Sequence, residues 1–374
     1  MVTRPRPGMC FLLAMMLSGC THFSVDDCPD GVLGNNEPGS ARLRTSHYRV
    51  MLADPAAAAA RFLPYSIMSA YAYRLGDGCR DRGNDNRILP ARAALLTRWL
   101  QDTAGSSGAW QSAATADMRG LPDALKRGCE DETGLMFHVW HRNINGSEEV
   151  VLAFRGTSGA GDWRYGNLWW FSRAFTADTQ LSRARAYAQE VMRHFNEKAL
   201  SEKAPPPRYI TTGHSLGGSL AQHVLYAFPR QVEQAIVFDT SSVTGFVDPS
   251  ISRDDRVDAC ACKPELGPEA RIIRVYQTYE ILANLRIFHK LILPPERHVQ
   301  EVRFPFDAPV NPVSRHGIGE FTDKLHERSK TRRRDEVRQS WIASADNRCT
   351  APLIKFQSAA CSIVPEKNSA ACPQ

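Results

Sequence analysis

The stretch that most constrains the fold is residues 207–228, PRYITTGHSLGGSLAQHVLYAF. It begins with β-branched residues that favour a strand and ends with residues that favour a helix. Between them lies the pattern G-x-S-x-G, in which Gly213 and Gly217 flank Ser215. A strand that turns sharply into a helix leaves no room for side chains at these glycines and presents the serine at the turn. The stretch therefore predicts a strand, a tight turn and a helix.

The rest of the chain alternates between short apolar stretches and longer helical ones. Residues 135–142 and 149–156 have the composition of strands, and the NING sequence between them predicts a hairpin turn. Continuous apolar strands that alternate with helices indicate an α/β fold, with a mostly parallel central sheet and helices on both faces. Further strands are expected at 208–213, 234–239, 271–279 and 298–304, and helices at 54–76 (broken near Pro64), 90–101, 180–200, after Gly217 and after Gly319.

The N-terminal residues have the features of an export signal. Arg4 and Arg6 precede the apolar residues 9–17, which are too few to span a bilayer as a helix. The sequence LSGC at 17–20 resembles the bacterial lipobox, which implies that Cys20 is lipidated and becomes the mature N-terminus. Thr21 after it resembles the pattern of outer-membrane lipoproteins. We expect a signal peptide at 1–19, a tether at 20–53, one α/β domain at 54–345 and a cysteine-containing tail at 346–374, in a protein anchored in the bacterial cell envelope, facing the periplasm or the surface.

Composition narrows the class of partner. The chain has 374 residues, of which 43% are hydrophobic and 23% charged, with a formal net charge of +6, as is ordinary for a globular protein. The basic run at 324–338 is typical of a solvated helix face or, less often, of a helix face on a membrane surface, and nothing resembles a nucleic-acid-binding motif. We therefore expect no nucleic-acid partner, whereas the oligomeric state is left open.

Cysteine usage predicts disulfides rather than a metal site. Ten cysteines are present, and eight remain once Cys10 leaves with the signal and Cys20 carries lipid. An even number of cysteines in an exported chain indicates disulfides, although the sequence does not choose their pairing. No CxxC pair or histidine cluster at ligand spacing supports a metal, and the CAC at 260–262 is interpreted as loop. The eight are Cys28, Cys79, Cys129, Cys260, Cys262, Cys349, Cys361 and Cys372.

Several motifs together resemble a known family. GHSLGG, preceded by VVLAFRGTSGAGDW, is similar to the class 3 lipase family, and YSIMSAYAY and GLMFHVWHR extend the likeness over about residues 63–325. The resemblance implies an α/β-hydrolase fold and hydrolysis of acylglycerol or phospholipid esters without metal or organic cofactor. It makes Ser215 the nucleophile, with the backbone N–H groups of Leu216 and Thr157 as the oxyanion hole.

The acid and the base are less directly indicated. The segment 274–286 resembles the part of the family that bears the catalytic acid, but this chain has Glu280 where the family usually has aspartate. Asp239, after the strand at 234–239, is the alternative acid. The base must follow the acid in this fold, and His316, in a loop before a helix, is favoured among the histidines that do so. The other candidates are His289, His298 and His326; His214, beside the nucleophile, is interpreted as a packing residue.

An aromatic segment at 162–175 occupies the place of the mobile lid in fungal members of the family. Such a cluster is also typical of a core, so both interpretations stay open. We expect a lipid ester as substrate and a membrane as partner through Cys20. The alternative is an inactive hydrolase fold that serves as a lipid-binding or interaction module. The lid candidates are Trp163, Leu168, Trp169, Trp170 and Phe171.

Overall fold

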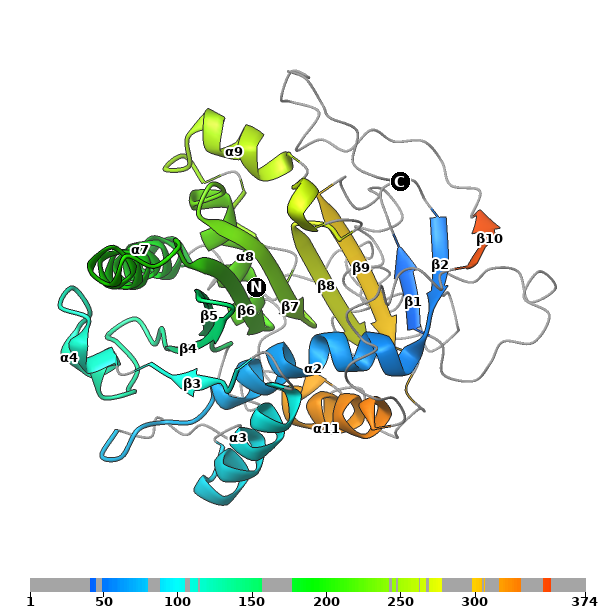
Figure 1. The fold of residues 1–374 in the computed structure, drawn as a ribbon, viewed down its shortest axis with the longest axis horizontal. Coiled ribbons are helices and arrows are strands. Elements are labelled where there is room, and N and C mark those ends of the chain that lie inside the picture. The colour runs from blue at the N-terminus through cyan, green and yellow to red at the C-terminus, as the bar shows by residue number, and fades with distance from the viewer. Residues whose placement is uncertain are drawn as a thin grey trace, which may run out of the picture.

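The computed structural model describes a mixed α/β protein built on one ten-stranded sheet (Figure 1). The strand order is β10-β2-β1-β9-β8-β7-β6-β5-β4-β3. The described residues are 41–44, 49–79, 88–104, 108–113, 115–156, 177–241, 244–246, 248–261, 263–266, 269–277, 298–304, 306, 316–330 and 346–350.

Five strands in the middle of the sheet are parallel. They are β5 (Ser147–Phe154), β6 (Arg208–His214), β7 (Val232–Phe238), β8 (Ile272–Gln277) and β9 (Val299–Phe304). The strands on either side pair antiparallel, so the predicted parallel sheet is limited to this centre. The flanking strands are β1 (Ala41–Arg44), β2 (Arg49–Ala53) and β10 (Asp346–Thr350) on one side, and β3 (Gln111–Ser112) and β4 (Phe137–Ile144) on the other.

Helices cover both faces of the sheet, as predicted (Figure 1). Alternate residues of a strand point to opposite faces, so Ile236 and Phe238 of β7 belong to one core and Ala235 and Val237 to the other. The first core is closed by α2 (Pro55–Tyr71), α3 (Pro90–Ala104) and α11 (Ile318–Ser329), and the second by α4 (Asp123–Lys126), α7 (Ala177–Glu202), α8 (Leu216–Ala227) and α9 (Arg253–Cys260). Two 3₁₀ turns lie at Thr115–Asp117 and Pro264–Leu266.

The predicted hairpin is confirmed. β4 and β5 pair antiparallel from Phe137 opposite Phe154 to Ile144 opposite Ser147. The two residues between the strands, Asn145 and Gly146, both have positive φ, of 53° and 87°. This is the geometry of a tight hairpin turn, which Asn-Gly adopts at low cost.

Three sequence expectations differ from the structure. α2 runs unbroken through Pro64, because packing of its apolar face against the sheet outweighs the roughly 3 kcal/mol that an internal proline costs a helix. Residues 41–44 and 49–53 of the expected tether, and 346–350 of the expected tail, form β1, β2 and β10. Strands of only four or five residues leave a weak sequence signal, because the pattern that would reveal them is too short to stand out. Cys260, expected in a loop, ends α9.

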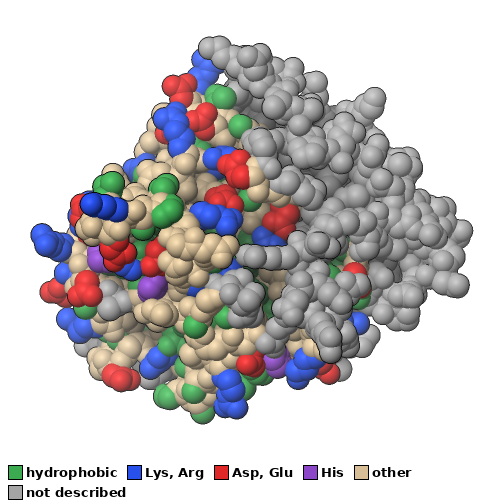
Figure 2. All heavy atoms as spheres, viewed as in Figure 1, with side chains coloured by type: hydrophobic (Ala, Val, Ile, Leu, Met, Phe, Trp, Pro, Cys, Tyr) green, Lys and Arg blue, Asp and Glu red, His purple; other side chains and the backbone are tan. Residues whose placement is uncertain are grey.

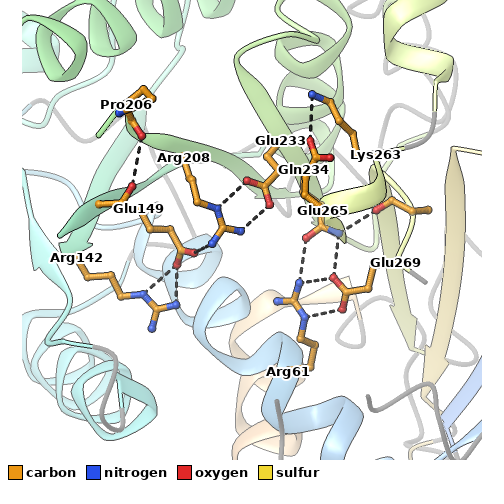
Figure 3. A network of polar contacts seen from close by, with 12 residues as sticks. Arg61, Arg142, Glu149, Pro206, Arg208, Glu233, Gln234, Lys263, Glu265 and Glu269 are labelled. Atoms are coloured by element: carbon orange, nitrogen blue, oxygen red, sulfur yellow. Dashed lines mark hydrogen bonds and ion pairs between the residues drawn. The ribbon is translucent and has the colours of Figure 1, made fainter. Parts of the chain in front are cut away.

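A polar network joins the ends of the central strands that lie away from the candidate site (Figure 3). Arg142 pairs with Glu149 at 2.7 Å, and Arg208 pairs with Glu233 at 2.6 Å. Nearby, Arg61 of α2 binds Glu269 at 2.7 Å, and both contact Gln234. Burial is tolerated here because each charge faces an opposite one. The neighbouring carboxylate of Glu269 raises the pKa of Arg61 against the effect of burial.

None of the helices in the described ranges combines the length and the hydropathy that a bilayer-spanning helix requires.

Candidate active site

The backbone at Ser215 is in a conformation that serine rarely adopts. Ser215 follows β6 and caps α8, with φ 55° and ψ −122°. A residue other than glycine in such a region costs about 1–3 kcal/mol, and it persists only where its surroundings hold it. Here the Ser215 N–H donates to the Phe238 carbonyl at 3.0 Å, and the Ser215 carbonyl accepts from Gly218 N–H at 3.1 Å. The strained turn predicted from G-x-S-x-G is thus present.

The glycines around Ser215 permit close backbone contacts. A Cβ on Gly213 would lie 2.4 Å from the Gly217 carbonyl carbon, and one on Gly217 would lie 2.2 Å from the Phe154 carbonyl oxygen. Both distances are shorter than real Cβ contacts, and the atoms met are backbone atoms that cannot rotate away. The glycines therefore let α8 begin directly against the end of β5.

Two predicted residues lie together at the edge where the parallel strands end. Asp239 follows β7 and His316 precedes α11, and both are buried. One ring nitrogen each of His214 and His316 and one carboxylate oxygen of Asp239 all lie within 4.8 Å of one another. Because His214 and Ser215 are consecutive, this cluster adjoins the Ser215 turn. The structure therefore brings a serine, an imidazole and a carboxylate from distant parts of the chain to one edge of the sheet.

Gln277, at the end of β8, holds the Asp239 carboxylate. Its backbone N–H donates to Asp239 Oδ1 at 3.1 Å and its side-chain amide donates to Oδ2 at 3.3 Å. Gln277 was not among the site residues predicted from the sequence. Its position could have indicated it, because Gln277 ends a predicted strand and the ends of adjacent parallel strands lie side by side.

His214 has polar contacts rather than only packing ones. Tyr73, just beyond α2, lies with its hydroxyl 2.9 Å from His214 Nδ1, and the His214 and His316 ring centroids are 4.7 Å apart. Burial lowers the pKa of His214 well below 6.5, the nearby His316 lowers it further, and a hydrogen bond with the His316 backbone partly opposes this. His214 is therefore neutral at physiological pH. Tyr73, the last residue of YSIMSAYAY, was missed as a site residue by the sequence analysis.

The other predicted bases that the structure describes lie elsewhere. His298 precedes β9, with its Nε2 3.1 Å from the Tyr226 hydroxyl. His326 stacks on Trp99 with the ring centroids 3.7 Å apart. Leu216 is the first residue of α8, so its N–H is one of the helix-terminal donors without an acceptor inside the helix. Outside the described residues lie Cys20, Thr157, Trp163, Leu168, Trp169, Trp170, Phe171, Glu280 and His289.

The cluster of His214, Asp239 and His316 is also the set of donors, among the residues described, that could hold a metal ion. Zinc holds nitrogen and carboxylate ligands at about 2 Å. The ligand atoms of the three residues all lie within 4.8 Å of one another, so any pair more than about 4 Å apart would have to move closer to hold such an ion. Tyr73 hydrogen-bonds His214 Nδ1 and Gln277 hydrogen-bonds the Asp239 carboxylate, and contacts of this kind orient the side chains of metal sites and of acid–base sites alike.

Comparison with protein-family models and with curated proteins found no match to this chain.

Proposed function

We propose that this protein is a serine carboxylic ester hydrolase that acts on lipid esters, of triacylglycerol lipase or phospholipase type, with an α/β-hydrolase fold of the class 3 lipase kind. The observation that carries the proposal is the positive φ of Ser215, at the edge of the sheet where His316 and Asp239 also lie. A strained serine that opens a helix beside an imidazole is the arrangement expected of an activated alcohol nucleophile.

In the proposed mechanism the Ser215 hydroxyl attacks the ester carbonyl carbon while His316 accepts its proton. The C–O bond to the alcohol then breaks, His316 returns the proton to the departing alkoxide, and the acyl group stays on Ser215. Water, deprotonated by His316, hydrolyses this ester and restores the serine. The N–H of Leu216, with that of Thr157, would stabilise the negative oxygen of each tetrahedral intermediate.

A carboxylate would orient His316 and stabilise its imidazolium form. Asp239 and Glu280 are both candidates, and the position of Asp239 within 4.8 Å of a His316 ring nitrogen supports the former. The motif at 17–20 supports a lipid anchor at Cys20, which would place the enzyme at a membrane of the bacterial envelope and near lipid substrates.

The test is covalent labelling with a fluorophosphonate, together with hydrolysis of p-nitrophenyl esters of graded chain length. We expect labelling of the wild type and a loss of at least about a thousandfold in both readouts for Ser215→Ala. Ser219→Ala is the matched control, because Ser219 is a buried serine one turn further along α8. It should keep both readouts. Faster hydrolysis of long-chain than of short-chain esters would support a lipid substrate.

In the same assay, Asp239→Asn and Glu280→Gln identify the acid. The variant of the true acid should lower kcat by about three to four orders of magnitude, while the other stays near wild type. A folded wild-type protein that is neither labelled nor active would contradict the proposal. It would favour an inactive lipid-binding module instead.

A further inference from the structure

We infer that Tyr73 is a positioning residue, whose hydroxyl holds the Ser215 turn against the end of β5 in the geometry needed for attack. The inference rests on the proposed function. It concerns a residue that touches neither Ser215 Oγ nor His316 through any described hydrogen bond, and that would act through its neighbours.

The Tyr73 hydroxyl connects two chain segments that meet at the nucleophile. On one side it lies 2.9 Å from Nδ1 of His214, which immediately precedes Ser215. On the other it is hydrogen-bonded to the backbone of Gly156, two residues beyond β5. One oxygen thus joins the end of β5 to the end of β6.

The same contact explains why residue 156 is glycine. A Cβ there would lie 2.5 Å from the Tyr73 hydroxyl oxygen, 2.5 Å from the His214 carbonyl oxygen and 3.2 Å from the Ser215 Cβ. Tyr73, Gly156 and the Ser215 turn are therefore in direct van der Waals contact. A small displacement of any one would move the other two.

The direction of the hydrogen bonds follows from the charge states. Burial raises the pKa of the Tyr73 phenol, so it stays protonated, and His214 is neutral. The Gly156 N–H donates to the phenol oxygen, which leaves the phenol O–H to donate to His214 Nδ1. This fixes the His214 ring, and with it the backbone on which the strained φ of Ser215 depends. Misplacement of a reacting group by about 1 Å can cost on the order of a hundredfold in rate.

The experiment compares Tyr73→Phe with Tyr209→Phe. Tyr209 is the matched control: it is as buried as Tyr73, and its hydroxyl donates to the Met192 carbonyl and contacts Asn196 Oδ1, both at 2.9 Å. It lies at the start of β6, far along the strand from the site. Each variant deletes one buried hydroxyl, so both should show a similar small fall in Tm.

Of these two variants, only Tyr73→Phe should lower the rates of ester hydrolysis and of fluorophosphonate labelling. We expect its kcat and its rate of fluorophosphonate labelling to fall about 10- to 100-fold with KM within about twofold. Tyr209→Phe should keep both rates. His214→Phe should lower them by a similar factor, and the double variant Tyr73→Phe/His214→Phe should be no slower than the slower single variant, because both changes break one contact.

Equal labelling rates for wild type and folded Tyr73→Phe would overturn this inference while leaving the proposed function in place. Additive losses in the double variant would likewise contradict it. If wild type is not labelled at Ser215 at all, the proposed function fails first and this inference fails with it. Should Tyr73→Phe not fold, a His214→Phe variant that folds and labels at the wild-type rate would overturn it in the same way.

Discussion

At the scale of single residues, the protein buries several histidines in neutral form. Burial, with nearby Arg274 and Arg271, lowers the pKa of His298 to about 3. Burial is also the main reason that the pKa of His138 falls to about 4, where its Nε2 lies 3.1 Å from the Arg74 carbonyl. The ordinary pKa of histidine is about 6.5, so at a pH below this value each of these rings gains a proton when the chain unfolds.

This predicts acid sensitivity with a definite sign. The folded pKa of His298 lies below the unfolded one, so its contribution to stability is complete above pH 6.5 and is lost as pH falls toward 3. The loss is about 1.4 kcal/mol per pH unit within that window. The check is the free energy of unfolding in guanidinium at pH 7.5, 6.0 and 5.0. Below pH 6.5 it should fall less steeply with decreasing pH in His298→Gln than in wild type, by about 1.4 kcal/mol per pH unit. Parallel pH dependences would contradict the assignment of a depressed pKa.

At the scale of elements, the junction of β6 and α8 requires glycine, because no side chain fits at two of its positions. Gly213 and Gly217 meet backbone atoms where a Cβ would lie, whereas a Cβ on Gly319, in the first turn of α11, would meet nothing within 4 Å. The same substitution should therefore have opposite effects at the two kinds of position.

We predict that Gly217→Ala lowers the free energy of unfolding by more than about 3 kcal/mol and abolishes fluorophosphonate labelling, because the Phe154 carbonyl has to move. Gly319→Ala should stabilise the protein by about 0.5–1 kcal/mol, since alanine has the higher helix propensity, and should leave labelling unchanged. Thermal unfolding and labelling of both variants provide the check. A stable, labelled Gly217→Ala protein would show that the turn is not as tight as these contacts indicate.

At the scale of the whole molecule, a disulfide, a backbone hydrogen bond and an ion pair connect the segments that lead to the candidate site. Cys79, shortly after α2, forms a disulfide with Cys129 across 50 residues, and Gly76 N–H donates to the Gly128 carbonyl at 2.9 Å. Glu130, next to Cys129, pairs with the buried Arg155 at 2.6 Å, and Arg155 immediately precedes Gly156. The disulfide thus ties the segment that bears Tyr73 to the loop that supports the end of β5. Cys260 is also disulfide-bonded.

Removing this cross-link should cost stability and some activity. We expect Cys79→Ala/Cys129→Ala to lower the free energy of unfolding by about 2–4 kcal/mol, chiefly by loosening the unfolded chain. Its labelling rate should also fall, by less than that of Tyr73→Phe. Denaturant unfolding of the oxidised wild type and of the double variant measures the difference. A double variant as stable as wild type would contradict the expectation.

Surface charges contribute less to the stability of the fold than this disulfide does. On the face shown in Figure 2, acidic and basic side chains of the described residues lie interspersed. Many are paired, such as Arg193 with Glu190 and Glu197 on α7. Exposed pairs of this kind typically contribute under about 1 kcal/mol each. Stability therefore depends mainly on the two cores, the disulfides and the buried network of Figure 3.

Local features of the sequence determined the α/β class, most of the strands and helices of the sheet core, the hairpin turn and the strained serine. Each depends on short-range sterics or on periodic apolar residues, which a linear sequence displays directly: Gly146 follows Asn145, and Gly213 and Gly217 flank Ser215. Tertiary structure alone decided that β1, β2 and β10 join the sheet, that α2 continues through Pro64, and that Tyr73, His214, Asp239, Gln277 and His316 meet at one edge. These outcomes depend on contacts between residues up to hundreds of positions apart, whose energies no local pattern records.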